Sequence, residues 1–440
     1  MSGSFHVETL GCPKNQVDSD KLVGALLADG LRPASDAESA DLVVVNTCAF
    51  IEAARQESID TVLSLDGRRR EGSRLVVTGC MAERYGEELA AALPEVDRVA
   101  GFGVGLDPMR RPDRGRQTRL IPVSATPVPE FDLLNLPRPK SSAPWAYVKI
   151  AEGCDRTCGF CAIPSFRGKQ RSRDVAQILA EVDDLGVKEI VLVAQDLASY
   201  GKDRPDELGA GSIVPLVRAV GERVARVRLL YLYPSDLSDE LIDVVCASPV
   251  PYFDLSLQHV SKPLLRRMRR WGDGDRFIRR IAEIRSRRPD AAFRSNFIVG
   301  YPGETEEDHD RLLRFVEEAE LDWCGFFAYS REEGTYAAGL DDQVPSTLVA
   351  ERLGELTELQ DAITSARRDE LVGTVVEVLV DRSGIGRSHR EAPEIDGVVL
   401  VDASLAIGSF SDVTIVDALG SDLIASGADL SSISEALEQL

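Results

Sequence analysis

Long apolar runs are missing from this chain of 440 residues. No stretch approaches the roughly 18 consecutive apolar residues of a membrane-spanning helix, so the sequence predicts no membrane span. Its first residues also lack the basic start and the apolar core of a secretion signal. We therefore expect a cytoplasmic protein whose eight cysteines are reduced and free to bind metal.

Histidine is scarce as well, and positive charge is outnumbered by negative charge. The chain has four histidines, and none of them stands in a pattern that predicts a catalytic role. Acidic residues outnumber lysine and arginine by 73 to 51, which gives a net charge of -22. An acidic protein repels nucleic acid at long range and attracts basic partners. A hydrophobic share of 44% is enough for a packed core.

Three cysteines fall close together in the spacing CxxxCxxC: Cys154, Cys158 and Cys161. A predicted apolar strand, 145–150, runs directly into them, and Gly153 and Gly159 allow the loop to turn back so that the sulfurs converge. Converging thiolates bind iron–sulfur clusters or zinc. Because structural zinc takes four ligands, three cysteines favour a four-iron cluster with one iron open to a substrate or cofactor. A zinc knuckle completed by a distant residue is the alternative.

A second group of three cysteines is spread over residues 1–118. Each follows an apolar run that is typical of a buried strand: Cys12, Cys48 and Cys80. Helical patterns at 18–29, 52–65 and 85–93 separate these runs. Strands alternating with helices predict an open parallel α/β sheet, whose strand ends share one edge. We expect the three cysteines to meet at that edge and form a second cluster site, although three ordinary buried cysteines would also fit the pattern.

The middle of the chain predicts a barrel. Residues 119–144 are rich in proline and favour a semi-rigid linker, with short strand content near Leu120. Six apolar strands alternate with amphipathic helices between 145 and 370, which predicts a partial (β/α)6 barrel. The CxxxCxxC loop follows the first of these strands. It should therefore lie at the C-terminal mouth, where such barrels carry their active sites.

Other strand ends should bring groups to the same mouth. The fifth strand ends at 300–304 in Gly-Tyr-Pro-Gly-Glu, whose glycines would let a ligand approach the backbone. The second strand ends at Gln195, which would face the lumen. A plain strand–helix turn, or polar residues that are hydrogen-bonded within the core, are the alternatives at these two places.

From 371 to 440 the pattern changes to period two, which predicts a small antiparallel β-barrel. This segment has 12 acidic residues, three arginines and no lysine, the opposite of what nucleic-acid binding requires. The one strongly basic stretch is the arginine run at 266–288. A solvated helix face explains that run better than RNA binding does.

Taken in this order, the three parts resemble the radical S-adenosylmethionine methylthiotransferases, which end in a barrel of the TRAM type. In that family Cys154, Cys158 and Cys161 would hold the radical [4Fe-4S] cluster, whose open iron chelates S-adenosylmethionine. The first three cysteines would hold an auxiliary [4Fe-4S] cluster. By the resemblance or by their place at a strand end, the residues expected to line the cofactor are Phe160, Gln195, Gly300, Pro302, Gly303 and Glu304.

The sequences around the cysteines are closest to the branch of this family that modifies the twelfth protein of the small ribosomal subunit. An example is Leu10-Gly-Cys-Pro-Lys-Asn-Gln-Val-Asp-Ser19, since the tRNA-modifying relatives usually lack Cys-Pro-Lys-Asn. The resemblance implies that a 5′-deoxyadenosyl radical takes hydrogen from the β-carbon of an aspartate. The auxiliary cluster then presents a sulfide that a second S-adenosylmethionine has methylated. No side chain is expected to act as an acid–base catalyst.

The expected partners are the basic ribosomal protein and a low-potential electron donor such as flavodoxin or ferredoxin, without membrane or direct RNA binding. The acidic C-terminal barrel should recognise the substrate, so its removal should spare cofactor cleavage and abolish modification. The alternatives are methylthiolation of an adenosine beside the tRNA anticodon, and a non-catalytic zinc-binding adaptor.

Overall fold

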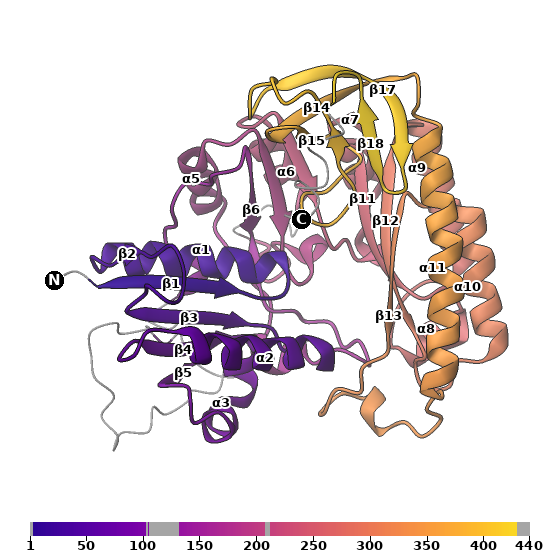
Figure 1. Ribbon diagram of the computed structural model, residues 1–440. Coiled ribbons are helices and arrows are strands. Elements are labelled where there is room, and N and C mark those ends of the chain that lie inside the picture. The colour runs from indigo at the N-terminus through magenta and orange to yellow at the C-terminus, as the bar shows by residue number, and fades with distance from the viewer. Residues whose placement is uncertain (1–2, 103, 105–131, 207–211, 429–440) are drawn as a thin grey trace.

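The computed structural model describes residues 3–102, 104, 132–206 and 212–428. It has an N-terminal α/β layer, a curved central sheet covered by helices, and a C-terminal β-barrel (Figure 1). In the described ranges, no helix is long and apolar enough to cross a lipid bilayer.

The N-terminal sheet is parallel, with the strand order β2-β1-β3-β4-β5. The strands are β1 (Ser4–Thr9), β2 (Arg32–Pro33), β3 (Leu42–Thr47), β4 (Arg74–Gly79) and β5 (Arg98–Ala100). The helices are α1 (Pro13–Ala28) on one face, and α2 (Glu52–Arg68) and α3 (Cys80–Ala92) on the other. The predicted open parallel sheet is confirmed. Helix α1 begins earlier than predicted because Pro13, whose φ is fixed at a helical value, starts its first turn.

The central part is a six-stranded partial barrel in two halves, β10-β9-β6 and β11-β12-β13, which a bridge between Leu232 and Leu255 joins. All pairs within the halves are parallel. The strands are β6 (Trp145–Lys149), β9 (Glu189–Val193), β10 (Arg226–Leu229), β11 (Tyr252–Gln258), β12 (Ala292–Val299) and β13 (Trp323–Ala328). The helices that cover them are α5 (Val175–Leu185), α6 (Val214–Gly221), α7 (Asp239–Ala247), α8 (Lys262–Arg267), α9 (Gly274–Arg287), α10 (Glu306–Ala319) and α11 (Ser346–Asp369). The predicted (β/α)6 barrel is confirmed.

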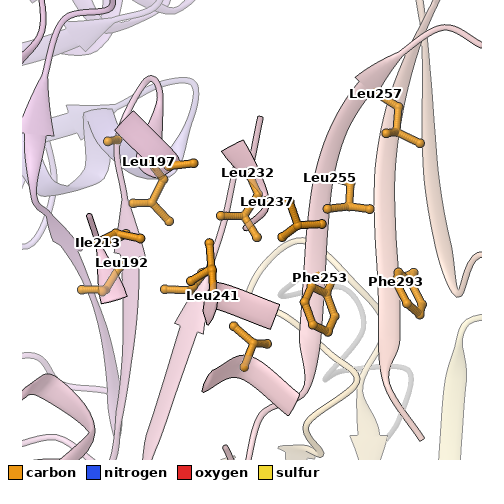
Figure 2. Packing of buried hydrophobic residues seen from close by; sticks show 14 of the residues in the cluster. Leu192, Leu197, Ile213, Leu232, Leu237, Leu241, Phe253, Leu255, Leu257 and Phe293 are labelled. Carbon is orange, nitrogen blue, oxygen red and sulfur yellow. The ribbon is translucent and has the colours of Figure 1, made fainter. Parts of the chain in front are cut away.

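Alternate residues of the barrel strands face opposite sides. Phe253 and Leu255 of β11 pack outward in the large core that includes the covering helices (Figure 2). Tyr252 belongs to a second cluster, with Tyr147 of β6 and Val191 of β9, on the inner side of the strands. We call this inner side the lumen.

The C-terminal barrel is closed and has the strand order β14-β15-β16-β18-β17. Its strands are β14 (Val375–Arg382), β15 (Ile385–Arg387), β16 (Val399–Leu400), β17 (Phe410–Leu419) and β18 (Asp422–Ala425). The predicted barrel is confirmed, but its purely antiparallel pairing is wrong, because β16 and β18 pair in parallel. A closed barrel with an odd number of strands cannot alternate direction all the way round, so one parallel pair is required.

The connection between β15 and β16, residues 388–398, fills the N-terminal end of the lumen, and we call it the floor segment. Tyr147 donates its hydroxyl hydrogen to the carbonyl oxygen of Pro393 at 2.8 Å. Trp323 of β13 donates to the carbonyl of Arg390, also at 2.8 Å. Ala392 is fully buried within the lumen cluster. The C-terminal barrel is therefore built into the base of the central barrel (Figure 1).

Part of the predicted linker is described, residues 132–144. This part packs against α1, because the buried Lys21 donates to the carbonyl oxygens of Leu134 at 2.8 Å and Leu136 at 3.1 Å. The strand content predicted near Leu120 lies outside the described residues.

Candidate active site

The three N-terminal cysteines follow three adjacent parallel strands at one edge of the sheet. Cys12 follows β1, Cys48 follows β3 and Cys80 follows β4. The loop before α1 passes close to the second cysteine: Gly11 has φ +93°, and a Cβ added there would lie 2.8 Å from the Cβ of Cys48. Only glycine leaves the space for this approach.

The pKa values of the three thiols in this triad are shifted in different directions. Burial raises the pKa of Cys48 to about 12 and also raises that of Cys80, which Arg167 offsets in part. Burial alone would raise the pKa of Cys12 too, but Lys14 and Arg167 outweigh it, so this pKa is lowered. Metal ions bind thiolates and release the protons of buried thiols on binding. The triad has the chemistry of a metal site, with a cation already beside it.

The CxxxCxxC loop is closed at its base by two short strands, β7 (Ala151–Glu152) and β8 (Arg171–Ser172). The amide of Cys154 donates to the carbonyl of Gly168 at 3.0 Å. Gly153 has φ +79°, and a Cβ added there would lie 2.1 Å from the carbonyl oxygen of Lys169. This glycine is what allows the loop to close on itself. The short helix α4 (Ile163–Arg167) follows the third cysteine.

Arginines that the sequence patterns did not identify hold this loop. Arg270 donates to the Sγ of Cys158 at 3.4 Å and stacks on the ring of Tyr233 at 4.0 Å. Arg156 stacks on the same ring at 3.9 Å and pairs with Asp196 at 2.6 Å. The interpretation of the 266–288 run as a solvated helix face is therefore wrong for Arg270, whose role depends on contacts far away in the sequence.

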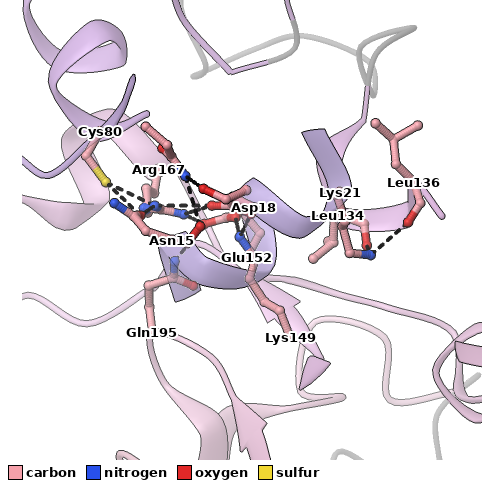
Figure 3. A network of polar contacts seen from close by, with 12 residues as sticks. Asn15, Asp18, Lys21, Cys80, Leu134, Leu136, Lys149, Glu152, Arg167 and Gln195 are labelled. Carbon is pink, nitrogen blue, oxygen red and sulfur yellow. Dashed lines mark hydrogen bonds and ion pairs between the residues drawn. The ribbon is translucent and has the colours of Figure 1, made fainter. Parts of the chain in front are cut away.

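Arg167, at the end of α4, joins the N-terminal triad to Glu152, at the base of the CxxxCxxC loop (Figure 3). Its guanidinium donates to Cys80 Sγ at 3.0 Å, to Asn15 Oδ1 at 2.7 Å and to Glu152 Oε1 at 2.9 Å. It therefore touches the N-terminal triad and, through β7, the base of the CxxxCxxC loop. Its position just after the third cysteine is the only signal in the sequence that could have suggested this role.

Several polar atoms at the mouth are buried without a partner among the described residues. Gln195 donates to Glu152 at 2.7 Å, but its Oε1 has no donor, and neither do Asn296 Oδ1 and the hydroxyl of Tyr329. Buried polar atoms are normally hydrogen-bonded. These strand ends therefore have bonding capacity for a ligand. Phe160 lies within the CxxxCxxC loop, partly buried against the large core.

The 300–304 turn is bound mainly to the protein itself. Glu304 is buried and accepts hydrogen bonds from the amides of Gly300 at 2.6 Å and Tyr301 at 3.3 Å. It also pairs with Arg352 of α11 at 3.0 Å. Gly300 and Gly303 both have positive φ, and added Cβ atoms would meet side chains of this chain. We infer that Glu304 shapes the turn, while Pro302 is buried within it.

Among the described residues, no group of three His, Cys, Asp or Glu side chains is arranged to hold a single metal ion. Each triad offers three thiols, whereas a structural zinc ion takes four ligands. The donor set therefore suits a four-iron cluster with one iron lacking a protein ligand better than it suits mononuclear zinc. That the six cysteines bind clusters stays a prediction.

Family comparisons agree with this architecture. "Uncharacterized protein family UPF0004" matches residues 4–101, the "Radical SAM superfamily" matches 148–316 and the "TRAM domain" matches 372–427. The chain is thus a radical S-adenosylmethionine enzyme with a C-terminal TRAM domain, and membership of this superfamily implies a [4Fe-4S] cluster and S-adenosylmethionine. Among solved structures it is similar to the radical S-adenosylmethionine methyltransferase TsrM of Kitasatospora setae, with 16% identity, a TM-score of 0.45, and coverage of 74% of this chain and 75% of that one.

Comparison with curated relatives places the chain in a narrower group of radical S-adenosylmethionine enzymes. The chain is 42% identical to the "ribosomal protein uS12 methylthiotransferase RimO" of Streptomyces coelicolor, over 95% of each chain. It is also 42% identical to the protein of that name from Anaeromyxobacter sp., over 96% of this chain and 93% of that one. The chain belongs to the RimO family of radical S-adenosylmethionine methylthiotransferases.

Proposed function

We propose that this enzyme methylthiolates the β-carbon of an aspartate in uS12, the twelfth protein of the small ribosomal subunit. The observation that carries the proposal is that Arg167 contacts Cys80 of the N-terminal triad and Glu152 at the base of the CxxxCxxC loop, in a chain that matches curated uS12 methylthiotransferases over nearly its whole length. Attaching sulfur to an unactivated carbon requires removal of a hydrogen that no side chain takes by acid–base means. A cofactor must therefore carry that step.

In this proposal the cysteines have separate roles. One [4Fe-4S] cluster is held by Cys154, Cys158 and Cys161, and an auxiliary [4Fe-4S] cluster by Cys12, Cys48 and Cys80. When bound, the clusters and S-adenosylmethionine supply the one-electron chemistry, the sulfur and the methyl group.

The protein side chains orient these groups and balance their charge. Arg270 donates to Cys158, and Arg167 donates to Cys80, and donors to sulfur of this kind tune the reduction potential of a cluster. Gln195 offers its unpaired Oε1 to S-adenosylmethionine. Phe160 and the backbone of 300–303 line the cofactor, and Glu304 fixes that turn through the Gly300 amide.

Charge supports a protein substrate. The chain carries a net charge of -22, which attracts a basic ribosomal protein and opposes binding of tRNA. The proposal requires a low-potential electron donor such as flavodoxin or ferredoxin, and it requires neither a membrane nor direct contact with RNA.

Mass spectrometry after an anaerobic reaction tests the proposal. The reconstituted enzyme, reductant and S-adenosylmethionine are mixed with uS12 in one reaction and with unmodified anticodon-arm tRNA in another. We expect a methylthio increment on an aspartate of uS12 and none on the RNA. An increment on the RNA alone would overturn the proposal in favour of the tRNA-modifying alternative. Formation of deoxyadenosine without either product would support the radical chemistry and refute uS12 as the substrate.

A further inference from the structure

Lys14 is an unusual cation for its position. It lies in the first turn of α1, two residues after Cys12. A positive side chain there is unfavourable, because the amide groups at a helix N-terminus already carry partial positive charge. Its Nζ lies 3.5 Å from the centroid of the Tyr231 ring. In the described part of the chain it has no carboxylate partner at ion-pair distance.

The other cations around the lumen and the two triads are already satisfied. Arg167 and Lys149 share Glu152 and Asp18, Arg156 pairs with Asp196 and Asp236, and Arg294 pairs with Asp396. Arg270 is held by Cys158 and by the carbonyl oxygen of Ser256. Unlike these cations, Lys14 has, within the ranges that the structure describes, neither a carboxylate at ion-pair distance nor a side-chain hydrogen bond, so it can meet an incoming anion.

Through Tyr231, Lys14 is joined to a chain of contacts that reaches Cys158. Tyr231 follows β10 with φ +66°, a strained conformation for a large side chain, and its amide is fixed by Asp254 at 2.9 Å. Two residues further, Tyr233 stacks under Arg270, which donates to Cys158. The path from Cys12 to Cys158 thus runs through Lys14 and the Tyr231–Tyr233 segment.

Below Lys14 lies the apolar part of the lumen. Tyr231 packs against the cluster that contains Leu230, Val193 and Val17. A carboxylate at this depth needs a cation, because burying an unpaired charge is costly, and a charge-assisted hydrogen bond from an ammonium group is strong in such surroundings.

We propose that Lys14 binds the side-chain carboxylate of the substrate aspartate and thereby holds its β-carbon between the two triads. This inference rests on the proposed function and adds the group that selects the target residue. An aspartate β-carbon is bonded directly to the carboxylate carbon, so one fixed cation limits where that carbon lies. Lys14 is a specificity-determining residue in this account, with no proton or electron to transfer.

A double-mutant cycle tests the pairing. The enzyme side is wild type, Lys14→Gln and Lys14→Arg, and the substrate side is uS12 with its target aspartate or with asparagine there. Affinity of the cluster-loaded enzyme for each labelled substrate is measured by fluorescence anisotropy. We expect wild type to prefer the aspartate form by about 10- to 150-fold, the contribution of a charged hydrogen bond. Lys14→Gln should bind both forms alike, and Lys14→Arg should recover part of the preference.

Iron content and the midpoint potential of the auxiliary cluster distinguish the competing role. If Lys14 only balances the charge of that cluster, Lys14→Gln will change the potential or the iron content and keep the preference for aspartate, which overturns the proposal. Equal affinity of the wild-type enzyme for the two substrates overturns it without any variant. Lys262→Gln, an exposed lysine of α8, is the matched control and should change nothing. Failure of the wild type to modify uS12 at all would instead refute the proposed function.

Discussion

At the scale of single residues, the buried guanidinium of Arg167 contacts Cys80, Asn15, Glu152 and Asp18 at once. Arg167→Met would leave Glu152 and Asp18 with Lys149 as their remaining cation and would remove the donor to Cys80. Breaking a buried ion pair on one side costs about 3–5 kcal/mol. We expect a loss of that size in the free energy of unfolding of the apoprotein, measured by urea denaturation through the transition that melts the N-terminal sheet.

Arg68→Met is the control for this variant. Arg68 is 59% exposed and pairs with Glu38 on the surface, so its removal should cost less than about 1 kcal/mol. Equal losses in the two variants would mean that Arg167 contributes no more than a surface ion pair.

A buried histidine predicts how stability depends on pH. His259 follows β11 and is fully buried, and burial lowers its pKa to about 4 from an ordinary 6.5. The unfolded chain takes up this proton as the pH falls below 6.5, whereas the folded chain does not, so stability is lost as the pH falls from about 6.5 to about 4. Between about pH 7.5 and about pH 5.5 the loss is roughly 1.4 kcal/mol.

His259→Asn isolates this effect. Asparagine keeps an acceptor for the Ser261 amide, which now donates to His259 Nδ1 at 3.0 Å, but it has no proton to gain. Urea denaturation at the two pH values should show a pH dependence smaller than that of the wild type by the same roughly 1.4 kcal/mol. An unchanged pH dependence would refute the assignment. His389, whose pKa burial also lowers to about 4, retains its contribution in both proteins.

At the scale of elements, the CxxxCxxC loop depends on one glycine. Gly153→Ala would force a Cβ to within 2.1 Å of the Lys169 carbonyl oxygen at φ +79°, so β7 and β8 could not stay paired. We expect the reconstituted variant to lose about half of its iron, that of the radical cluster. The spectrum of the auxiliary cluster, measured by electron paramagnetic resonance after reduction, should remain.

Gly186→Ala is the control that separates the strain of a positive φ from the collision of an added Cβ. Gly186, the residue that ends α5, also has positive φ, at +62°, but an added Cβ there meets nothing within 4 Å. It should cost about 1 kcal/mol of stability and leave the iron content unchanged. Equal iron loss in both variants would show that the backbone angle, and not the contact with Lys169, is what matters.

The elements that could be predicted from the sequence are those whose own residues form a clear apolar run. Strand β3 is buried at all six positions, LVVVNT, and its apolar run is visible without knowledge of its neighbours. Strand β15 was missed because it spans only Ile385–Arg387 and ends in a charged residue. That residue can be buried because it pairs with Asp381 of β14 and with Glu189 at 3.1 Å, a partner 198 positions away.

The same distinction applies to the candidate site. The six cysteines could be found because their residue type and spacing already indicate their chemistry. Arg167 could not, since its contact with Cys80 joins positions 87 residues apart. Asn296 was also missed as a ligand candidate, because a missing hydrogen-bond partner becomes visible only when all neighbours are known.

At the scale of the whole molecule, the charge of the C-terminal barrel should act on the substrate at a distance. Asp412 and Asp417 of β17 are exposed, so replacing both with lysine changes the charge by four units without disturbing the core. We expect weaker binding of the basic uS12, with a smaller dependence on salt, and unchanged cleavage of S-adenosylmethionine. Glu317→Lys with Glu318→Lys on α10, also exposed, makes the same change in net charge elsewhere. An equal effect of this control pair would mean that only the total charge matters.

Removal of the C-terminal barrel should do more than the sequence suggests. From sequence, a chain that ends at 370 is expected to keep cofactor cleavage and lose substrate modification. The floor segment and β15 change this expectation, because the buried Arg228 donates to the carbonyl of His389 at 2.9 Å and Glu189 pairs with Arg387 of β15 at 3.1 Å. Without these partners, Glu189 and Arg228 keep only each other as ion-pair partners among the described residues. Arg294 also loses Asp396 of the floor segment, its close carboxylate partner. Removing one side of a buried ion pair is strongly destabilising.

We therefore expect the chain that ends at 370 to melt at a lower temperature and to form little deoxyadenosine, whereas a chain that ends at 428 should keep both properties. Circular dichroism on heating and chromatography of the deoxyadenosine formed would measure these outcomes. Wild-type cofactor cleavage by the shorter chain would show that the central barrel is complete without its floor. In that case substrate recognition alone would explain why the C-terminal barrel is joined to it.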